Sequence, residues 1–232
     1  MQLSIIIPVI NEGEHLSHWL AHLAALRRED VEIIIVDGGS GDNSVAQAEA
    51  WGARVLHAPR GRASQMNAGA AAARGDLLLF LHADTWLPPS FRMEKLVTDL
   101  THSGRVWGRF AVSIQGRAWL LRVVAWMINL RSCLTGVATG DQGIFLFRHA
   151  FIQAGGFPEQ PLMEDIALSK RLLVISPPLC LEERVTTSGR RWERGGVWKT
   201  IFLMWRLRWA YWRGVPAEQL ASRYPDTRSG QT

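Results

Sequence analysis

The feature that most constrains the fold is an alternation of short apolar runs with helical patterns over the first hundred residues. In chain order, the apolar runs and the helical segments between them are 3–9, 14–26, 31–36, 44–51, 54–57, 63–73 and 77–81. Continuous apolar strands that alternate with helices are typical of a parallel sheet buried on both faces. We therefore predict an α/β fold with a mostly parallel central sheet flanked by helices.

Acid-bearing polar segments follow three of these apolar runs. Asn11 and Glu12 follow the first run, segment 37–42 follows the second, and segment 82–84 follows the last. In open parallel sheets, ligands bind beyond the carboxyl ends of the strands. Three such loops at matching positions predict one common crevice.

The pattern changes after Pro88 and Pro89. The segments of the second half are a helix at 91–101, an alternating segment at 105–114 typical of strands in a half-covered sheet, an apolar stretch at 118–130, the segment 140–147, a helix at 164–173 and a Trp-rich helix at 197–215. At 232 residues the chain is long enough for one large α/β domain. We expect this domain to span 1–225, with halves 1–115 and 116–225, and a flexible tail at 226–232.

The first two polar loops carry candidate nucleotide ligands. Glu12 follows the buried strand that contains Pro8, and its carboxylate can accept hydrogen bonds from a ribose or a base edge; the alternative is a helix N-cap cluster. Asp37 can accept from a uracil-like base, and the glycines after it, including Gly39, permit close backbone approach. We assign Asp42 to helix capping.

The next two segments offer charge for a diphosphate. Arg60 and Arg62 precede a small-residue helix, an arrangement that suits a diphosphate at a helix N-terminus, although surface solvation of the arginines is an equal alternative. His82 and Asp84 are potential metal ligands two residues apart, on one side of an extended chain. Oxygen ligands favour Mg²⁺ or Mn²⁺, which would neutralise a leaving nucleoside diphosphate. A hydrogen-bonded histidine is the alternative for His82.

Glu164 and Asp165 open a predicted helix and follow the Gly-Gly-Phe-Pro-Glu segment at 155–159. Paired carboxylates at a helix N-terminus can simply complement the helix dipole. The ordered context instead favours a fixed carboxylate that removes a proton from an acceptor hydroxyl.

The basic residues gather near the C-terminus. The formal net charge is +5 with a pI near 9.9, and the excess beyond Arg184 comes from Arg190, Arg191, Arg194, Lys199, Arg206, Arg208 and Arg213. In the helix at 197–215, Lys199, Arg206 and Arg213 flank a stripe of Trp198, Trp205, Trp209 and Trp212. The segment 118–130 repeats the pattern with Arg117, Arg122 and Arg131 around Trp119 and Trp126.

Tryptophan beside arginine is the composition of a helix at an anionic bilayer surface. The alternatives are a core helix whose arginines reach water, or a homodimer interface.

No uncharged stretch reaches about 18 residues, and the N-terminus lacks the features of a signal peptide. Cys133 and Cys180 form no disulfide framework. We therefore expect a cytoplasmic protein with reduced thiols, peripheral on the inner face of the membrane.

Several motifs resemble, in order, the signatures of family 2 glycosyltransferases of GT-A fold. They are Pro8 to Glu12, Asp37 to Asp42, Asn67 to Gly69, His82 to Asp84, Gly155 to Phe157, and Glu164 with Asp165. Segment 188–192 is similar to a Gln-x-x-Arg-Trp element with Ser188 in place of the glutamine. This element and segment 140–143 most resemble a small bacterial subgroup, often labelled transferase 2, associated with arsenosugar or carotenoid glycoside pathways.

The resemblance implies inverting transfer of a sugar from a UDP- or GDP-sugar to an acceptor hydroxyl, on a lipid-linked or apolar acceptor at a membrane. By the same resemblance, 1–115 binds the nucleotide sugar, and 116–225 holds the acceptor and carries aromatic, basic, membrane-proximal helices. The implied donor-binding residues are Pro8, Glu12, Asp37, Gly39, Arg62, Asn67, His82 and Asp84, and the last two are also the metal ligands for Mg²⁺ or Mn²⁺. Asp165 is the implied base, and the implied acceptor or diphosphate ligands are Asp141, Gln142, Glu164, Arg190, Arg191 and Trp192.

Two departures from the family pattern leave parts of this assignment open. His-Ala-Asp stands for the usual Asp-x-Asp, which bears on the metal, and Asp-Gly-Gly-Ser stands for Asp-Asp-Gly-Ser, which bears on base recognition. One alternative is a catalytically degenerate GT-A membrane-surface or scaffold protein, although Asp84, Glu164 and Asp165 are intact.

A sugar nucleotidyltransferase would need a glycine-rich phosphate loop with a lysine after the first strand, and a dinucleotide oxidoreductase would need Gly-x-Gly-x-x-Gly there; neither is present. We expect no nucleic-acid binding, because the basic residues alternate with large aromatics and form no reader motif.

Overall fold

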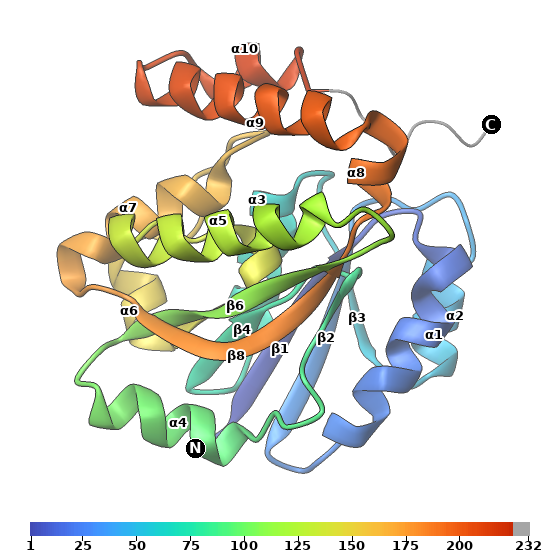
Figure 1. Ribbon diagram of the computed structural model, residues 1–232. Coiled ribbons are helices and arrows are strands. Elements are labelled where there is room, and N and C mark those ends of the chain that lie inside the picture. Colours follow the sequence, from blue (N-terminus) through green and yellow to red (C-terminus); the bar gives the residue numbers. More distant parts are fainter. Residues whose placement is uncertain (225–232) are drawn as a thin grey trace.

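The computed structural model describes residues 1–224, apart from the side chains of Arg191 and Arg194. The predicted tail at 226–232 lies outside these residues. The described chain forms one eight-stranded sheet in the order β3-β2-β1-β4-β7-β6-β8-β5, with helices on both faces (Figure 1). This arrangement confirms the predicted α/β class.

The first half of the sheet is parallel, as predicted. Its strands are β1 (Leu3–Val9), β2 (Val31–Asp37), β3 (Arg54–His57) and β4 (Leu77–Phe80). In register, Ile5 on β1 lies between Ile33 on β2 and Leu79 on β4. All seven residues of β1 are buried, because helices cover both faces. An uninterrupted apolar run is what such a strand requires.

Three helices and one short turn connect these strands: α1 (Gly13–Leu23), η1 (Ala24–Leu26), α2 (Ser44–Ala50) and α3 (Arg62–Ala72). α1 and α2 pack on one face of the sheet, together with α4 (Met93–His102). α3 packs on the other face, where Gly69 lies so close to Ile6 that a Cβ atom would clash. The small residues of this helix therefore bring its N-terminus close to the strand ends.

The second half of the sheet is mixed. Its strands are β5 (Thr85–Trp86), β6 (Trp107–Gln115), β7 (Ile144–Phe147) and β8 (Leu179–Ser188). β7 is antiparallel to both β4 and β6, β5 is antiparallel to β8, and β6 is parallel to β8. Four of the seven strand pairings are therefore parallel, and the parallel character predicted for the whole sheet belongs mainly to its first half.

The half-covered sheet predicted for 105–114 is wrong. β6 lies inside the sheet between β7 and β8, and seven of its nine residues are buried. The polar Arg109 that contributed to the alternating pattern is covered by α5 (Leu120–Thr135), where it donates a hydrogen bond to the Asn129 carbonyl. In the sequence, a buried arginine cannot be distinguished from an arginine on the solvent-exposed face of an amphipathic strand.

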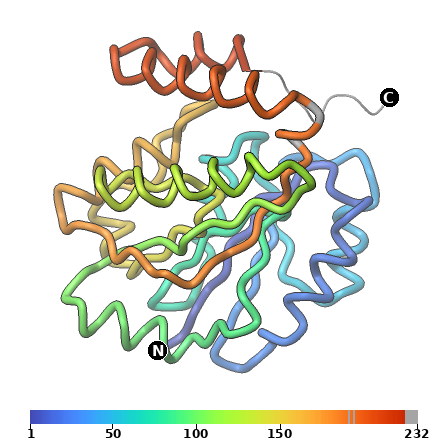
Figure 2. The backbone as a smooth tube through the Cα atoms, in the orientation of Figure 1, coloured from blue at the N-terminus to red at the C-terminus, as the bar shows by residue number. Residues whose placement is uncertain are grey.

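The C-terminal helices form an outer layer over α5 (Figures 1 and 2). The helices that follow β7 are α6 (Arg148–Gln153), α7 (Glu164–Ile175), α8 (Arg190–Gly195), α9 (Val197–Trp212) and α10 (Ala217–Ala221). α9 packs on α5 through Val197 and Ile201, and on α7 and α10 through Leu207. None of the helices within residues 1–224 combines the length and the apolar character that crossing a bilayer requires.

Candidate active site

The loops after β1 and β2 are joined by hydrogen bonds, as the crevice prediction requires. The Asn11 side chain accepts from the Gly41 N–H at 2.8 Å, and the Ser40 hydroxyl accepts from the Asn11 N–H at 2.9 Å. The Glu12 N–H donates to the Ser44 hydroxyl at 2.9 Å. These contacts fix the two loops relative to each other at the carboxyl ends of the strands.

Asp37 shapes the turn after β2. Its carboxylate is 3% exposed and accepts from the backbone N–H groups of Gly39 and Ser40 at 2.9 and 3.1 Å. Burial alone would raise the pKa of Asp37, but hydrogen bonds from the Ser40 side chain, the Gly39 and Ser40 N–H groups and His57 outweigh it and hold the pKa below its usual value. Gly39 has a φ of +91°, which favours glycine. Asp42 accepts from Ser44 and Gly13, so it caps as predicted.

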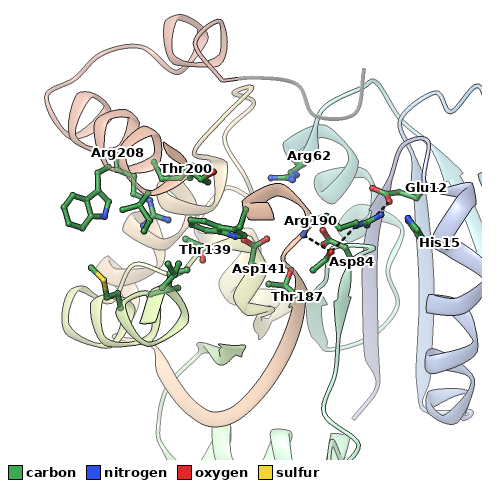
Figure 3. A pocket seen from close by; sticks show the side chains of 18 of the residues that line it. Glu12, His15, Arg62, Asp84, Thr139, Asp141, Thr187, Arg190, Thr200 and Arg208 are labelled. Carbon is green, nitrogen blue, oxygen red and sulfur yellow. Dashed lines mark hydrogen bonds and ion pairs between the residues drawn. The ribbon is translucent and has the colours of Figure 1, made fainter. Parts of the chain in front are cut away.

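Glu12 begins α1 with its backbone, but its side chain makes no capping hydrogen bond. The Glu12 carboxylate instead lies 4.0 Å from the Arg190 guanidinium, across the opening between β1 and β8 (Figure 3). Arg190 also donates through Nε to the Ser188 hydroxyl at 3.0 Å, and the Ser188 N–H donates to the Asp84 carbonyl at 3.1 Å. The end of β8 therefore brings Arg190 beside two predicted donor ligands.

These residues line a cavity of about 680 Å³ at the carboxyl ends of the strands. Its polar side includes Asn11, Glu12, Arg62, Asp84, Asp141, Thr187, Ser188 and Arg190. Its apolar wall comes from α5 and α9 and includes Val124, Met127, Ile128, Ile201, Met204 and Trp205, with Arg131 and Arg208 among them. The cavity thus joins a charged floor to an apolar wall.

Arg62 is the first residue of α3 and lies among four carboxylates. They are, in decreasing influence, Glu164, Asp141, Asp84 and Asp165, and together they hold the pKa of Arg62 above its ordinary value although burial acts to lower it. Arg62 is half-buried, whereas Arg60 is exposed. Arg62, the arginine named as a donor-binding residue, is therefore the less exposed of the two.

His82 contacts the loop at 140–142, where a short 3₁₀ helix, η2 (Gly140–Gln142), precedes β7. Its Nδ1 lies 3.1 Å from an Asp141 carboxylate oxygen, and its ring packs against Gly140, where a Cβ atom would clash with it. His82 as a whole is 6% exposed. This is the alternative of a hydrogen-bonded histidine at a strand end, with Asp141 as its partner.

Within residues 1–224, no group of three or more His, Cys, Asp and Glu side chains is arranged to hold a metal ion. Asp84 alone presents an oxygen ligand to the cavity from the predicted metal motif. Mg²⁺ is commonly bound by one or two carboxylates together with substrate phosphates, and the donor set here fits that mode.

Glu164 and Asp165 begin α7 as predicted. Asp165 accepts from the N–H groups of Gly140 and Ile166 at 2.8 and 2.7 Å. Glu164 is 4% exposed, and burial, followed by the charge of Asp165, raises its pKa to about 7. Neither residue lines the cavity, whereas Asp141 does. Asp165 is connected to the cavity through its hydrogen bond to Gly140, which precedes the cavity-lining Asp141.

Six predicted site residues line the cavity: Glu12, Arg62, Asp84, Asp141, Arg190 and Trp192. Pro8 is buried within β1. The Asn67 amide hydrogen-bonds to the N–H and the carbonyl of Phe157. Gln142 is buried and donates to the Ser132 hydroxyl. The side chain of Arg191 lies outside the described part of the structure. Sequence reasoning found Arg131 and Arg208 only as surface charges, yet both face the cavity.

Comparison with known proteins gives the family and the fold. Residues 4–154 match the model of the family described as glycosyl transferase family 2. An undecaprenyl-phosphate 4-deoxy-4-formamido-L-arabinose transferase from Sodalis glossinidius (strain morsitans) is 35% identical over 167 residues, which are 66% of this chain and 51% of that protein. The chain thus spans about half the length of this relative.

Solved structures show the same fold at low identity. S. aureus TarS 1-349, in complex with UDP-GlcNAc, superimposes with a TM-score of 0.64 at 15% identity, over 81% of this chain and 58% of that one. The mannosyltransferase PcManGT from Pyrobaculum calidifontis, in complex with GDP-Man and Mn²⁺, gives 0.61 at 18% identity, over 90% of this chain and 61% of that one. Both likenesses support the GT-A architecture predicted from the motifs.

Proposed function

The chain belongs to glycosyl transferase family 2, and from this premise we propose that it moves a sugar from a nucleoside-diphosphate donor to a hydroxyl of an amphiphilic acceptor. The observation that carries the proposal is the cavity itself, which joins acidic and arginine side chains at the strand ends to an apolar wall from α5 and α9. Direct displacement with one base inverts the anomeric carbon.

The donor is expected at the charged floor. We expect Glu12 to accept from a ribose or a base edge, and Arg62 and Arg190 to bind the diphosphate, because all three line the cavity. We propose that Asp84, together with phosphate oxygens of the donor, holds Mg²⁺ or Mn²⁺. Such a cation supplies charge stabilisation for the leaving nucleoside diphosphate. UDP-GlcNAc in TarS, and GDP-Man with Mn²⁺ in PcManGT, support this class of donor.

Asp165 is the proposed base. Its carboxylate is fixed by the Gly140 N–H beside Asp141, which lines the cavity. Catalytic hydrogen bonds are often long or poorly aligned without substrate and tighten when it binds, so the position of Asp165 behind this loop is compatible with the role. His82 contacts the same loop through Asp141, and Glu164 interacts electrostatically with Asp165, Arg62 and His82.

The acceptor is expected to approach from the α5 and α9 side. Four tryptophans of α9, Trp198, Trp205, Trp209 and Trp212, are between 55% and 73% exposed. Trp119 and Trp126 at α5 are exposed as well, and the Arg213 guanidinium lies 5.0 Å from the Trp209 ring centroid. We propose that this Trp/Arg surface rests on an anionic membrane at its cytoplasmic face. The undecaprenyl phosphate in the name of the Sodalis relative supports a lipid acceptor.

The test is a donor screen with purified protein. UDP-GlcNAc, UDP-glucose and GDP-mannose would each be incubated with Mn²⁺ or Mg²⁺, and released nucleoside diphosphate measured with and without a bacterial lipid extract. We expect one donor to be turned over, faster with lipid, and turnover to stop in chelator. Release of pyrophosphate from a nucleoside triphosphate and a sugar phosphate would instead indicate a nucleotidyltransferase. Absence of any binding or turnover would indicate a degenerate fold.

A further inference from the structure

Two arginines face the cavity from the helices that form its apolar wall. Arg131 lies on α5 and Arg208 on α9, and Figure 3 shows Arg208 on the α9 side, away from Arg62, Arg190 and Glu12. Arg131 donates from Nη1 to the Val137 carbonyl at 3.2 Å. Its Nε and Nη2 atoms, and Nε of Arg208, are buried without a hydrogen-bond partner.

Their charges lack a paired anion. Neither arginine makes an ion pair with any residue in the described part of the chain. Burial and the nearby charge of Arg208 lower the pKa of Arg131 to about 10, and burial lowers that of Arg208. The charge of Asp165 acts to raise the pKa of both arginines, and the charge of Asp141 acts to raise that of Arg208. Both guanidiniums stay protonated at neutral pH.

A third arginine, Arg109, adds to the positive charge around Arg131. Arg109 on β6 is 3% exposed and donates hydrogen bonds to the backbone carbonyls of Phe110, Leu181 and Asn129. Its charge also lowers the pKa of Arg131. Buried charges without an anionic partner are costly, so Arg131 and Arg208 at one end of the cavity, with Arg109 behind Arg131, point to an anion that enters from outside.

The surroundings define what carries this anion. The arginines lie among Val124, Met127, Ile128 and Met204, which would contact an apolar chain. The wall continues to the exposed tryptophans of α9, where such a chain would leave the protein. A free inorganic anion would use the arginines and leave this wall uncovered.

We propose that Arg131 and Arg208 bind the phosphate group of a long-chain isoprenyl or alkyl phosphate, as the headgroup site of the acceptor. The acceptor hydroxyl of the proposed function is then the P–OH of this phosphate, whose oxygen bonds to the anomeric carbon as the nucleoside diphosphate leaves. This inference rests on the proposed function and names its acceptor class. Arg208 lies beyond residues 4–154, so the family match assigns it no role. A guanidinium pair can hold phosphate by several charge-assisted hydrogen bonds, which satisfies the buried Nε and Nη2 atoms.

The experiment is a titration of the full chain with farnesyl phosphate, farnesol and inorganic phosphate, by calorimetry in detergent below its micelle concentration. We expect farnesyl phosphate to bind at least tenfold more tightly than the other two. Arg131→Gln and Arg208→Gln should each weaken farnesyl phosphate binding at least tenfold and leave farnesol binding unchanged. Arg206→Gln is the matched control, because Arg206 lies on the same helix and is exposed.

UDP and GDP binding in the presence of Mn²⁺ separates the two proposals. It should be equal in wild type, Arg131→Gln and Arg208→Gln. A loss of nucleotide binding in these variants would assign the arginines to the donor diphosphate and overturn the inference. Equal affinity for farnesol and farnesyl phosphate, or an equal loss in Arg206→Gln, would overturn it as well. If wild type binds farnesyl phosphate but neither nucleotide, the proposed donor chemistry fails and the phosphate site stands.

Circular dichroism would establish that the variants fold. Should the glutamine variants fail to fold, Arg208→Lys replaces them. This variant keeps the charge and loses the planar fork, and it should weaken farnesyl phosphate about fivefold to tenfold while farnesol binding is unchanged. Unchanged farnesyl phosphate affinity in Arg208→Lys would contradict the headgroup site.

Discussion

The donor side and the acceptor side of the cavity satisfy their polar groups in opposite ways. On the donor side, Asp37 and Asp42 are bonded to backbone N–H groups, and the Gln65 amide donates to the Val9 and Val36 carbonyls at 2.9 and 2.7 Å. On the acceptor side, Arg131 and Arg208 keep buried nitrogens without partners. One side is complete as folded, and the other retains unsatisfied groups.

The contrast shows where each side obtains its specificity. A loop network that is complete without ligand is preorganised, so a nucleotide loses little affinity to reordering. An arginine pair that is incomplete until an anion binds costs stability in the free protein, and stability given up at a site is a common requirement of function. We therefore expect donor-side substitutions to act on every acceptor alike, and acceptor-side substitutions to act selectively.

The largest effect is expected for Asp84→Ala. Loss of the proposed metal ligand removes several kcal/mol of charge stabilisation, which corresponds to about a thousandfold or more in turnover. Nucleoside diphosphate release would be measured over a range of Mn²⁺ concentrations. Asp76→Ala is the control, because Asp76 precedes the same strand at its opposite end. Full activity of Asp84→Ala in chelator would remove the metal from the proposal.

The next prediction concerns the protonation of Glu164, whose carboxyl interacts with Asp165 and with Arg62 on the donor side. Its pKa is raised from 4.5 to about 7, chiefly by burial. The folded state therefore binds the proton more tightly than the unfolded state, and wild type loses stability as pH rises from about 4.5 through about 7. The displacement corresponds to roughly 3 kcal/mol at most.

Glu164→Gln removes this titration. The variant should match wild type in thermal stability near pH 4.5 and exceed it at pH 8, measured by calorimetry at both pH values. The opposite sign, with the variant less stable at pH 8, would mean that the ionised Glu164 is stabilised by Arg62 more than it is penalised by burial.

Asp165→Asn tests whether Asp165 is the general base. Removal of a general base typically costs a hundredfold or more in turnover, and we expect that loss with nucleotide binding retained. Asp141→Asn is the parallel variant, because Asp141 lines the cavity and Asp165 does not. A larger loss in Asp141→Asn would transfer the base to Asp141. A loss under tenfold in both variants would indicate that an ionised phosphate oxygen attacks, since such a nucleophile needs no base.

The sequence predicted the donor side better than the acceptor side, for a physical reason. Buried parallel strands must be continuously apolar, so β1, β2 and β4 and the loops after them could be located from pattern alone. β8 was not predicted, because its pattern mixes charged Glu182, Glu183 and Arg184 with apolar residues. Helix periodicity also did not show that Arg208 points inward while Arg206 points outward.

The same limit explains the site residues that the structure places elsewhere. Asn67 and Gln142 stand in motifs whose resemblance to the family implied ligands, yet their amides bond Phe157 and Ser132. A side chain that shapes a loop and one that binds a ligand give the same motif in one sequence. His82 shows this most clearly, since its partner Asp141 is 59 residues away along the chain.

The smallest effect is expected for membrane binding, which acts on the acceptor side alone. Trp209 and Trp212 are 60% and 73% exposed on α9, and their transfer to a bilayer interface should contribute by apolar burial. We expect Trp209→Ser with Trp212→Ser to weaken sedimentation with anionic vesicles about tenfold, and high salt to weaken wild-type binding through screening. Ile152→Ser is the control, because Ile152 is an exposed apolar residue on α6.

Donor turnover without lipid should be unchanged in the double variant, because the nucleotide network does not involve α9. If wild type does not bind at low salt, the Trp/Arg surface contacts protein, and sedimentation equilibrium would then show a dimer that the double variant loses.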